Sequence, residues 1–348
     1  MPCIPRLRLP GFGRIRPALR RWRRRLGAEV VVLMYHRVAV VPCDPWNLCV
    51  KPDNFNEQLA VLKGQVTVIS VPELSQTLEK GTLPRRAVAL TFDDGYADNL
   101  LEAKPSLEKH NLPATLFLST GALDSHHEFW WDEVERIFLH PGTLPETLKL
   151  AINDQSRIWS LGAAASYDLS AWEQHRTWLA TTPPETVRQK VYYEVWNALR
   201  LLPTATREQL LDQLADWARQ PREARPTHRS LTSAEAQRLK AGGLFQLGAH
   251  TVSHPALSAH HRQVQEQEVR ASKEHIESRL GQPVRHFAYP YGDYSAETVE
   301  VVREIGFSSA FTTDHGCVIN SAPRWQLPRC MVCDWNGEEF AKRLAEMF

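Results

Sequence analysis

The stretch Thr91-Phe92-Asp93-Asp94-Gly95-Tyr96 follows a short apolar run, Ala87-Val88-Ala89-Leu90, of the kind that forms a buried strand. Two adjacent acids therefore stand at the end of a strand, just before a glycine that permits a sharp turn. Such a turn can bring both carboxylates into one cavity, where one could hold a cation and the other accept a proton from water. An exposed Asp-Asp-Gly turn is the alternative interpretation of this stretch alone.

Composition and charge bound the class of protein. The chain has 348 residues, of which 43% are hydrophobic and 23% are charged, as is typical of globular proteins. Nine of the 41 basic residues are arginines within residues 1–28, which contain no acid. The remaining 32 basic residues face 40 acidic ones, so the body carries a charge of about −8 and does not indicate a nucleic-acid-binding surface. The six cysteines are too scattered to suggest a disulfide framework.

The basic arm at residues 1–28 has apolar residues at helical spacing among its arginines: Ile15, Leu19, Trp22 and Leu26. This pattern fits a short helix of residues 1–26 on an anionic membrane surface, while a flexible basic tail, favoured by Pro17, is the alternative. We find no secretory signal and no apolar run of membrane-spanning length. We therefore expect a cytoplasmic protein, which a membrane-bound arm would place at the inner face of the membrane.

Strands and helices alternate in residues 29–124 and again in 231–348, which predicts two parts of one parallel β/α body, either a sheet or a barrel. Residues 125–230 differ, and we interpret them as a helical, tryptophan-rich insertion that splits this body. Its expected helices cover Asp132–Leu139, Ala171–Ala180, Glu185–Leu201 and Thr206–Arg219. The insertion leaves the body near the strand ends, at Trp130 and Trp131. We therefore expect it to form one wall of the active site and to narrow the choice of substrate.

A second group of candidate ligands follows the expected strand Phe245–Leu247. His250 and His254 are four residues apart and could direct their nitrogens at one ion. With Asp94 they would form a His-His-Asp site that leaves positions open for water and substrate, as catalytic metal sites do. Sites in β/α folds gather where strands end, which favours this interpretation over a solvated histidine pair.

The next strand runs into Phe287-Ala288-Tyr289-Pro290-Tyr291-Gly292. Its proline and glycine predict an unusual backbone path, and one N–H there could face a developing oxyanion. A plain turn is the alternative.

Taken together, these motifs resemble the polysaccharide deacetylases of carbohydrate esterase family 4, the NodB homology domain. Thr91–Tyr96 is similar to the first motif of that family, His250–His254 to the second and Tyr289–Gly292 to most of the third. The resemblance implies an α/β fold, a deformed (β/α) barrel of the NodB type, here with a large helical insertion. It also implies removal of N-acetyl groups from an amino sugar, with one Zn²⁺ or another divalent ion per chain.

The same resemblance implies roles for individual residues. Asp93 would be the general base, and the Tyr291 N–H would help to form the oxyanion hole. The metal ligands would be Asp94, His250 and His254. For substrate contacts we name Trp131, Tyr96, Tyr289 and Pro290.

The chain departs from the family pattern at two places. Ala288 stands where the third motif usually begins with an arginine that orients the base, and Arg329 is our candidate to replace that arginine. The late Leu-x-His motif, which supplies the general acid, is absent. However, Leu33-Met34-Tyr35-His36 resembles the branch in which this motif lies near the start of the chain, as in poly-N-acetylglucosamine deacetylases. His36 is therefore our candidate acid, with His315 and Arg329 next in line.

These observations predict a metal-dependent hydrolase that acts on an N-acetylated glycan, which would be a polysaccharide, an oligosaccharide or a glycan precursor, in exopolysaccharide biosynthesis. Two other hypotheses stay open at this point. One is a catalytically idle relative that only binds carbohydrate, against which the intact Asp93, Asp94, His250 and His254 argue. The other is a membrane-surface scaffold in a glycan-synthesis assembly, which would act through the basic arm.

Overall fold

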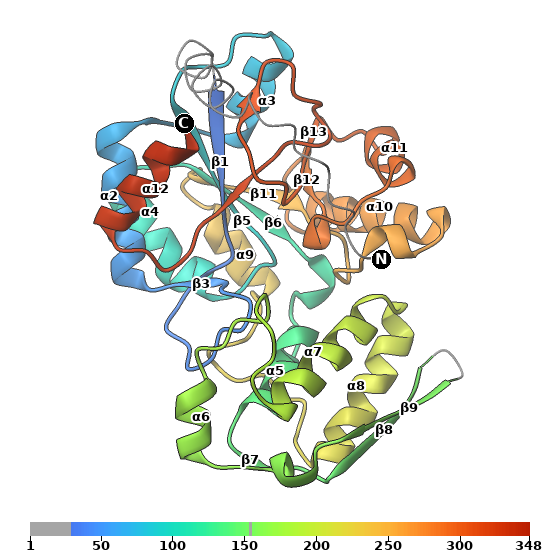
Figure 1. Cartoon of the computed structure of the whole chain (residues 1–348). Helices are drawn as coiled ribbons and strands as arrows, with labels where there is room; N and C mark the ends of the chain where they lie inside the picture. Colours follow the sequence, from blue (N-terminus) through green and yellow to red (C-terminus); the bar gives the residue numbers. More distant parts are fainter. Residues whose placement is uncertain (1–28, 153–154) are drawn as a thin grey trace, which may run out of the picture.

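The computed structural model describes residues 29–152 and 155–348. The basic arm at 1–28 lies outside these residues, and so do its expected membrane contact and the cellular location inferred from it. Within the described part of the chain, no helix is both long and apolar enough to cross a membrane. The molecule has two lobes, a larger one built on a sheet and a smaller one formed by the insertion (Figure 1).

A nine-stranded sheet forms the centre of the larger lobe, in the order β13-β12-β11-β6-β5-β1-β14, with β15 also paired to β1 and β4 to β5. The strands from β13 to β1 are parallel, whereas β14 is antiparallel to β1. The sheet curls into a half-barrel surrounded by helices, which confirms the predicted deformed (β/α) barrel. The strands are β1 (Glu29–Tyr35), β4 (Thr67–Ile69), β5 (Ala87–Phe92), β6 (Ala114–Leu118), β11 (Phe245–Ala249), β12 (His286–Ala288), β13 (Ser309–Phe311), β14 (Val318–Ile319) and β15 (Cys330–Met331).

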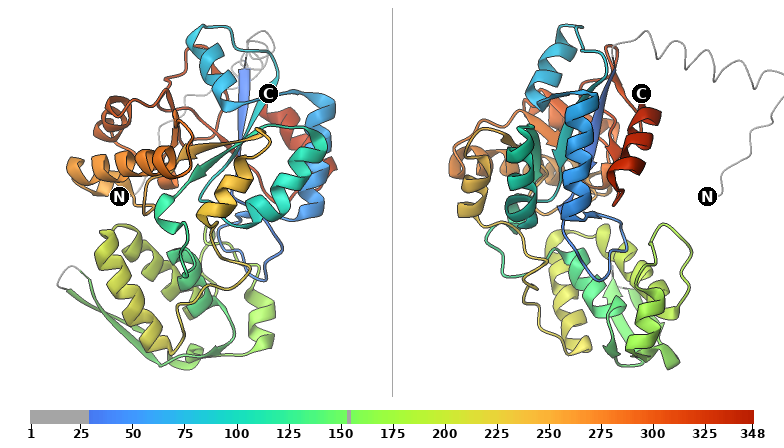
Figure 2. Two further views of the ribbon diagram at one scale, coloured as in Figure 1. Left: turned by 180° about the vertical axis from the view of Figure 1, so that it is seen from behind. Right: turned by 90° about the vertical axis from the view of Figure 1, so that its left-hand side faces the viewer.

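The helices of the larger lobe pack around this sheet (Figures 1 and 2). They are α2 (Pro52–Gln65), α3 (Val71–Glu79), α4 (Lys104–His110), α9 (Ser233–Lys240), α10 (Arg262–Arg279), α11 (Ala296–Glu304) and α12 (Gly337–Met347). Shorter helical turns are η1 (Asn99–Ala103), η2 (Thr120–Ala122), η4 (Leu257–Ala259) and η5 (Pro290–Gly292), and a small parallel pair joins β2 (Arg37–Val38) to β3 (Cys49–Val50).

Strand β5 is buried along its whole length because both of its faces are covered. Val88, Leu90 and Phe92 point to one side and pack in the main core with Phe55 of α2. Ala87 and Ala89 point to the other side, into a second cluster. A strand that is apolar on both faces belongs in the centre of a parallel sheet, and β5 accordingly pairs with β1 and β6. Its carboxyl end is thereby fixed in the middle of the fold.

The smaller lobe contains both helices and strands. Its helices are α5 (Trp130–Leu139), α6 (Leu169–His175), α7 (Val187–Arg200) and α8 (Thr204–Ala218), with the turn η3 (Gly162–Ala165). Two antiparallel pairs join β7 (Gly142–Thr143) to β10 (Ser166–Tyr167) and β8 (Thr147–Ile152) to β9 (Gln155–Ser160). From the sequence we named only helices in the insertion and did not predict the strands β8 and β9. In β8 alternate residues are buried, which is the period of a strand with one face on a core.

Two chain segments connect the lobes and run side by side. The Leu231 N–H donates to the Gly95 carbonyl (2.9 Å), and isolated bridges pair Tyr96 with Ser230 and Glu128 with Arg229. The core of the smaller lobe includes Tyr96 from the β5 turn, and Tyr291 packs against it. The insertion is therefore packed against the carboxyl ends of the strands (Figure 2).

The close packing behind the second motif gives a stability test. Gly248 lies in β11, and a Cβ there would collide with the Phe117 ring and come within 3.1 Å of the His286 carbonyl oxygen. We expect Gly248→Ala to lower the free energy of unfolding by ~1–3 kcal/mol, the usual range for overpacking. Urea unfolding curves of the purified variant measure this.

The matched control is Gly64→Ala. Gly64 lies in α2, where an added Cβ meets nothing within 4 Å, so alanine should raise the stability by up to ~1 kcal/mol. Equal midpoints for Gly248→Ala and the wild type would contradict the packing described here.

Candidate metal centre and catalytic residues

The turn after β5 presents two carboxylates to one site. Asp94 has φ = 72° and Gly95 has φ = 104°. This left-handed backbone ends the strict alternation of strand side chains, so that Asp93 and Asp94 lie close enough for the charge of Asp93 to raise the pKa of Asp94. Glycine is required at 95 for a second reason, because a Cβ there would collide with the Leu118 side chain.

Asp93 forms a buried ion pair with Arg329, which lies just before β15. Arg329 Nη1 donates to Asp93 Oδ1 (2.8 Å) and Nη2 donates to Oδ2 (2.7 Å). Arg329 is itself held by Nε, which donates to the Thr312 carbonyl (2.9 Å). Burial alone would raise the pKa of Asp93, but Arg329 and His250 lower it to about 2. The carboxylate is therefore ionised at neutral pH, and Arg329 lies where the sequence suggested a replacement for the missing arginine.

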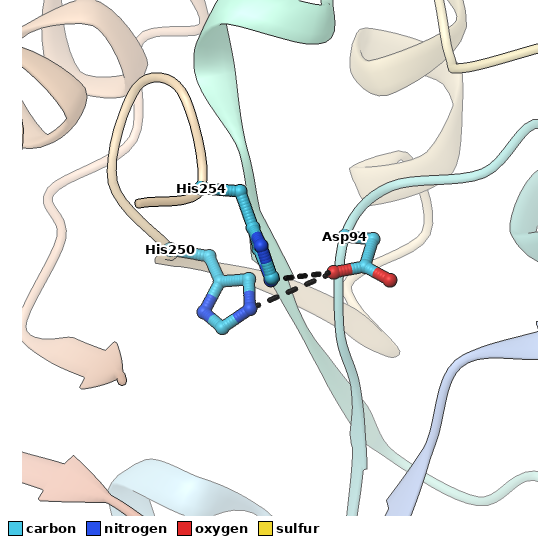
Figure 3. A group of neighbouring side chains, drawn as sticks. All are labelled: Asp94, His250 and His254. Carbon is cyan, nitrogen blue, oxygen red and sulfur yellow. Dashed lines mark ion pairs between the residues drawn. The ribbon is translucent and has the colours of Figure 1, made fainter. Parts of the chain in front are cut away.

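Asp94 faces the two histidines of the second motif (Figure 3). Its Oδ1 lies 3.6 Å from His250 Nε2 and 3.4 Å from His254 Nε2. The three ligand atoms lie within 4.8 Å of one another, and all three residues are buried. His250 Nδ1 is 2.8 Å from the Ala288 carbonyl. A bond from Nδ1–H to that oxygen leaves the lone pair of Nε2 directed toward Asp94.

The electrostatics of this triad fit a divalent cation. Asp94 Oδ1 has no hydrogen-bond partner among the described residues, although it is buried. Burial raises the pKa of Asp94 and lowers the pKa of both histidines. A buried carboxylate without a counter-charge is costly, and a bound cation would relieve that cost. Two imidazoles and one carboxylate are also a donor set that zinc and similar divalent ions accept.

The loop that carries the histidines is held in an uncommon backbone path. Thr251 and His254 both have positive φ, 65° and 55°. The Glu268 carboxylate accepts hydrogen bonds from the N–H groups of Val252 and Ser253, both at 2.9 Å. This strained loop turns both imidazoles toward Asp94, and such strain is typical of functional sites.

The third motif approaches the same site. Tyr291 lies in η5 with φ = 58°, and its ring contacts the His254 ring at a centroid distance of 4.4 Å. A Cβ at Gly292 would collide with the Thr313 side chain, so a glycine is needed to close this turn. Tyr291 thereby lies against His254, one of the three candidate ligands.

His36 follows β1 and is only partly buried. Burial lowers its pKa to about 4, while the nearby Asp93 carboxylate opposes this shift and Arg329 and His250 add to it. Asp93, Arg329 and His250 are therefore its electrostatic neighbours. The candidate base, acid and metal ligands thus come from three separate segments, which follow β1, β5 and β11, and they meet at one place.

Two of the expected substrate contacts are structural instead. Tyr96 is fully buried, and its hydroxyl donates to Asp132 Oδ2 (2.7 Å). Tyr289 is also fully buried, and its hydroxyl donates to the Trp325 carbonyl (2.9 Å). Both hydroxyl groups are hydrogen-bonded inside the protein. We therefore correct the assignment of Tyr96 and Tyr289 to substrate contact and regard them as structural residues. Pro290 is buried as well and serves to shape the η5 turn.

Trp131 links the insertion to the metal centre. Its Nε1 donates to the Tyr96 hydroxyl (2.7 Å), and its ring lies 4.7 Å from the His254 ring. It stacks on Phe129 and lines a cavity beside His254, so its assignment to substrate contact stays a prediction.

Asp132 was not singled out from the sequence. It accepts the Tyr96 hydroxyl bond, and burial raises its pKa to about 7 although Arg37 and Tyr96 oppose the shift. The sequence did offer a signal for Asp132. It is an acid directly after Trp130 and Trp131, at the start of a helix near the ends of the strands.

Comparison with known proteins places these motifs in a family. The family model for polysaccharide deacetylase matches residues 80–142 and 213–310, on both sides of most of the insertion. YxkH of Bacillus subtilis (strain 168) is 27% identical over 115 residues, which are 32% of this chain. The matched part is 40% of the length of YxkH, so the likeness extends over less than half of that curated relative.

Solved structures share the fold at low sequence identity. The Streptococcus pyogenes deacetylase PplD, solved with acetate, is 20% identical with a TM-score of 0.56, covering 91% of this chain and 99% of PplD. IcaB from Ammonifex degensii is 18% identical with a TM-score of 0.55, covering 92% of this chain and 97% of IcaB. With the half-barrel, the three motifs in order and the family match over both parts of the body, residues 80–142 and 213–310 of this chain form a polysaccharide deacetylase domain.

Proposed function

We propose that this protein is a metal-dependent N-deacetylase that removes N-acetyl groups from an amino sugar in a glycan. One observation carries the proposal. The buried, unpartnered Asp94 Oδ1 faces two histidine Nε2 atoms, directly beside a second carboxylate that an arginine holds in place. The family match supports the same reaction, and among the solved structures of this fold is a de-N-acetylase from Aggregatibacter actinomycetemcomitans (15% identical, TM-score 0.55).

Asp94, His250 and His254 would hold the ion, which we take to be Zn²⁺ or a similar divalent metal, one per chain. Such an ion, when bound, polarises the acetyl carbonyl and lowers the pKa of water. The buried surroundings of the three ligands exclude competing water from their side chains.

Asp93 would accept the proton of the attacking water. Arg329 occupies one lone pair on each carboxylate oxygen, and each oxygen keeps another that can accept a proton. The two parallel bonds also fix the plane of the carboxylate. Arg329 is thus a positioning residue that keeps the base ionised and oriented.

The remaining roles belong to the backbone of Tyr291 and to His36. The Tyr291 N–H would donate to the oxygen on which charge develops, since Tyr291 lies in the η5 turn with its ring against His254. His36 would give the leaving amine its proton. Because the pKa of His36 is low, the imidazole is neutral before the reaction. It would therefore first take up the proton that Asp93 accepts from the water and then pass it to the amine, which leaves Asp93 ionised and His36 neutral again.

The proposed ligand set predicts the metal content of variants. Wild-type protein should carry about one divalent ion per chain, and His254→Ala should lose both the ion and the activity, because two ligands hold the ion weakly. Elemental analysis of purified protein measures this. His110→Ala, at a histidine on α4 outside the site, is the control and should keep the ion. Full occupancy in His254→Ala would refute the assignment.

The reaction itself predicts loss of acetyl groups from a glycan. Incubation with a panel of N-acetylated oligosaccharides should give products lighter by one acetyl group, with release of acetate, as measured by mass spectrometry. Asp93→Asn removes the base and should lower this rate by two to four orders of magnitude. A wild type that binds these glycans without releasing acetate would support the idle carbohydrate-binding alternative.

A separate prediction tests His36 as the acid. An amine leaves poorly unless it is protonated, whereas an activated phenolate hardly needs an acid. His36→Ala should therefore cost on the order of a hundredfold on an N-acetylated sugar and much less on an aryl acetate. The metal content should not change. Equal losses on the two substrates, or loss of the ion, would remove His36 from this role.

A further inference from the structure

A cavity of about 360 Å³ lies beside the metal centre, between the smaller lobe and the body. His254 and Trp131 form its wall toward the metal triad, while Trp130, Arg207 and Ser253 are among its other lining residues. Neither Asp94 nor His250 lines it, so it is a separate space that shares one ligand with the triad. Its volume lies in the range of small-molecule binding pockets.

The feature of this cavity that calls for a ligand is Arg207, on the first turns of α8. The side chain is only 2% exposed and makes one hydrogen bond, from Nη2 to the Ser253 carbonyl (2.7 Å). Its Nε and Nη1 have no hydrogen-bond partner among the described residues. Glu208 and Glu268 act on its charge only through space. The guanidinium lies near the Trp130 ring, 5.3 Å from its centroid, which compensates the charge only in part.

The other deeply buried arginines have partners for their charge or for their hydrogen-bond donors. Arg37 pairs with Asp98 (3.0 Å), and Arg329 pairs with Asp93. Arg188 has no carboxylate, but it donates to five backbone carbonyls, of Ala164, Phe138, His140, Gly142 and Ala165. Arg207 is the member of this group that keeps a buried positive charge with most of its donors unused. A buried charge of this kind is costly unless an anion reaches it.

The acids around the cavity are committed elsewhere. Glu133 and Glu208 both bind Arg222, at 2.7 and 2.8 Å. Glu128 binds Arg225 (2.7 Å), and Glu268 accepts hydrogen bonds from the loop that carries His254. The protein therefore supplies Arg222 and Arg225 with bound carboxylates, whereas Arg207 has none in direct contact, although it lies in the wall of a cavity.

We infer that this cavity is an anion-binding subsite in which Arg207 binds a carboxylate or phosphate group, next to the sugar that loses its acetyl group. The inference rests on the proposed function for the position of that sugar. The Trp130 and Trp131 rings give the cavity apolar walls against which a sugar ring can pack. The anion has two possible sources: an acidic substituent of the glycan, or the acetate that the reaction releases.

The first test compares substrates. We expect the wild type to prefer an oligosaccharide in which a uronate or phosphate neighbours the N-acetylated sugar over its neutral counterpart. Arg207→Gln should reduce this ratio of kcat/KM on the order of tenfold, because a charge-assisted bond is lost. The control is Arg219→Gln, an exposed arginine at the other end of α8, and it should keep the wild-type ratio.

The second test reads binding without turnover, so it does not depend on the proposed reaction. Isothermal titration of glucuronate, inorganic phosphate and acetate into the metal-loaded wild type should show tighter binding than in Arg207→Gln, with Arg207→Lys in between. Anion bound at the metal is common to all three proteins and cancels in the comparison. Thermal unfolding of each variant shows that it is folded.

The two tests distinguish the outcomes. A changed substrate ratio assigns the anion to the glycan, whereas an unchanged ratio with weaker acetate binding and weaker product inhibition assigns it to the released acetate. Equal anion binding by wild type and folded Arg207→Gln would overturn the inference. Anion binding at Arg207 in a protein that releases no acetate from any glycan would keep the subsite and contradict the proposed reaction.

Discussion

The buried ion pair between Asp93 and Arg329 is the interaction on which the arrangement of the site depends. The two residues are 236 positions apart, yet they form two hydrogen bonds of 2.7–2.8 Å. Removal of either partner would leave a charge buried without compensation, which typically costs 3–5 kcal/mol. The pair therefore ties the C-terminal segment, which runs into β15 beside β1, to the end of β5. The same contact fixes the orientation of the proposed base.

The insertion packs directly against the residues of this site. Tyr96, two residues after Asp94, is a member of the core of the smaller lobe, and its hydroxyl bonds Asp132 and Trp131 of α5. Trp131 in turn contacts His254. The proposed metal ligands thus lie between two cores, and a change in the packing of α5 would reach His254 through Trp131. If the cavity that holds Arg207 binds part of the glycan, as we propose, the smaller lobe would select substrates through it.

The sequence predicted those features that depend on local pattern. The acids after β5, the spaced histidines and the alternation of strands and helices are visible in short windows, and the structure brings them together as the motifs indicated. The contacts of Tyr96 and Tyr289 depend on distant partners, Asp132 and Trp325, so their burial could not be seen in a tyrosine beside a motif. In β8 the alternation of Leu148, Leu150 and Ile152 was a visible strand signal that we overlooked. In β9 only Trp159 is buried, so that strand carries little pattern. Arg207 keeps free hydrogen-bond donors because the nearby glutamates bind other arginines. This choice of partners cannot be seen in a sequence pattern.

We propose that Asp93 and Arg329 act as one catalytic unit, and a double-mutant cycle of acetate release measures this coupling. We compare the wild type with Asp93→Asn, Arg329→Met and the double variant, with metal content checked in each. If Arg329 acts only through Asp93, the double variant should be no slower than Asp93→Asn alone. A double variant whose loss equals the product of the two single losses would show that the two residues act independently and would contradict the account.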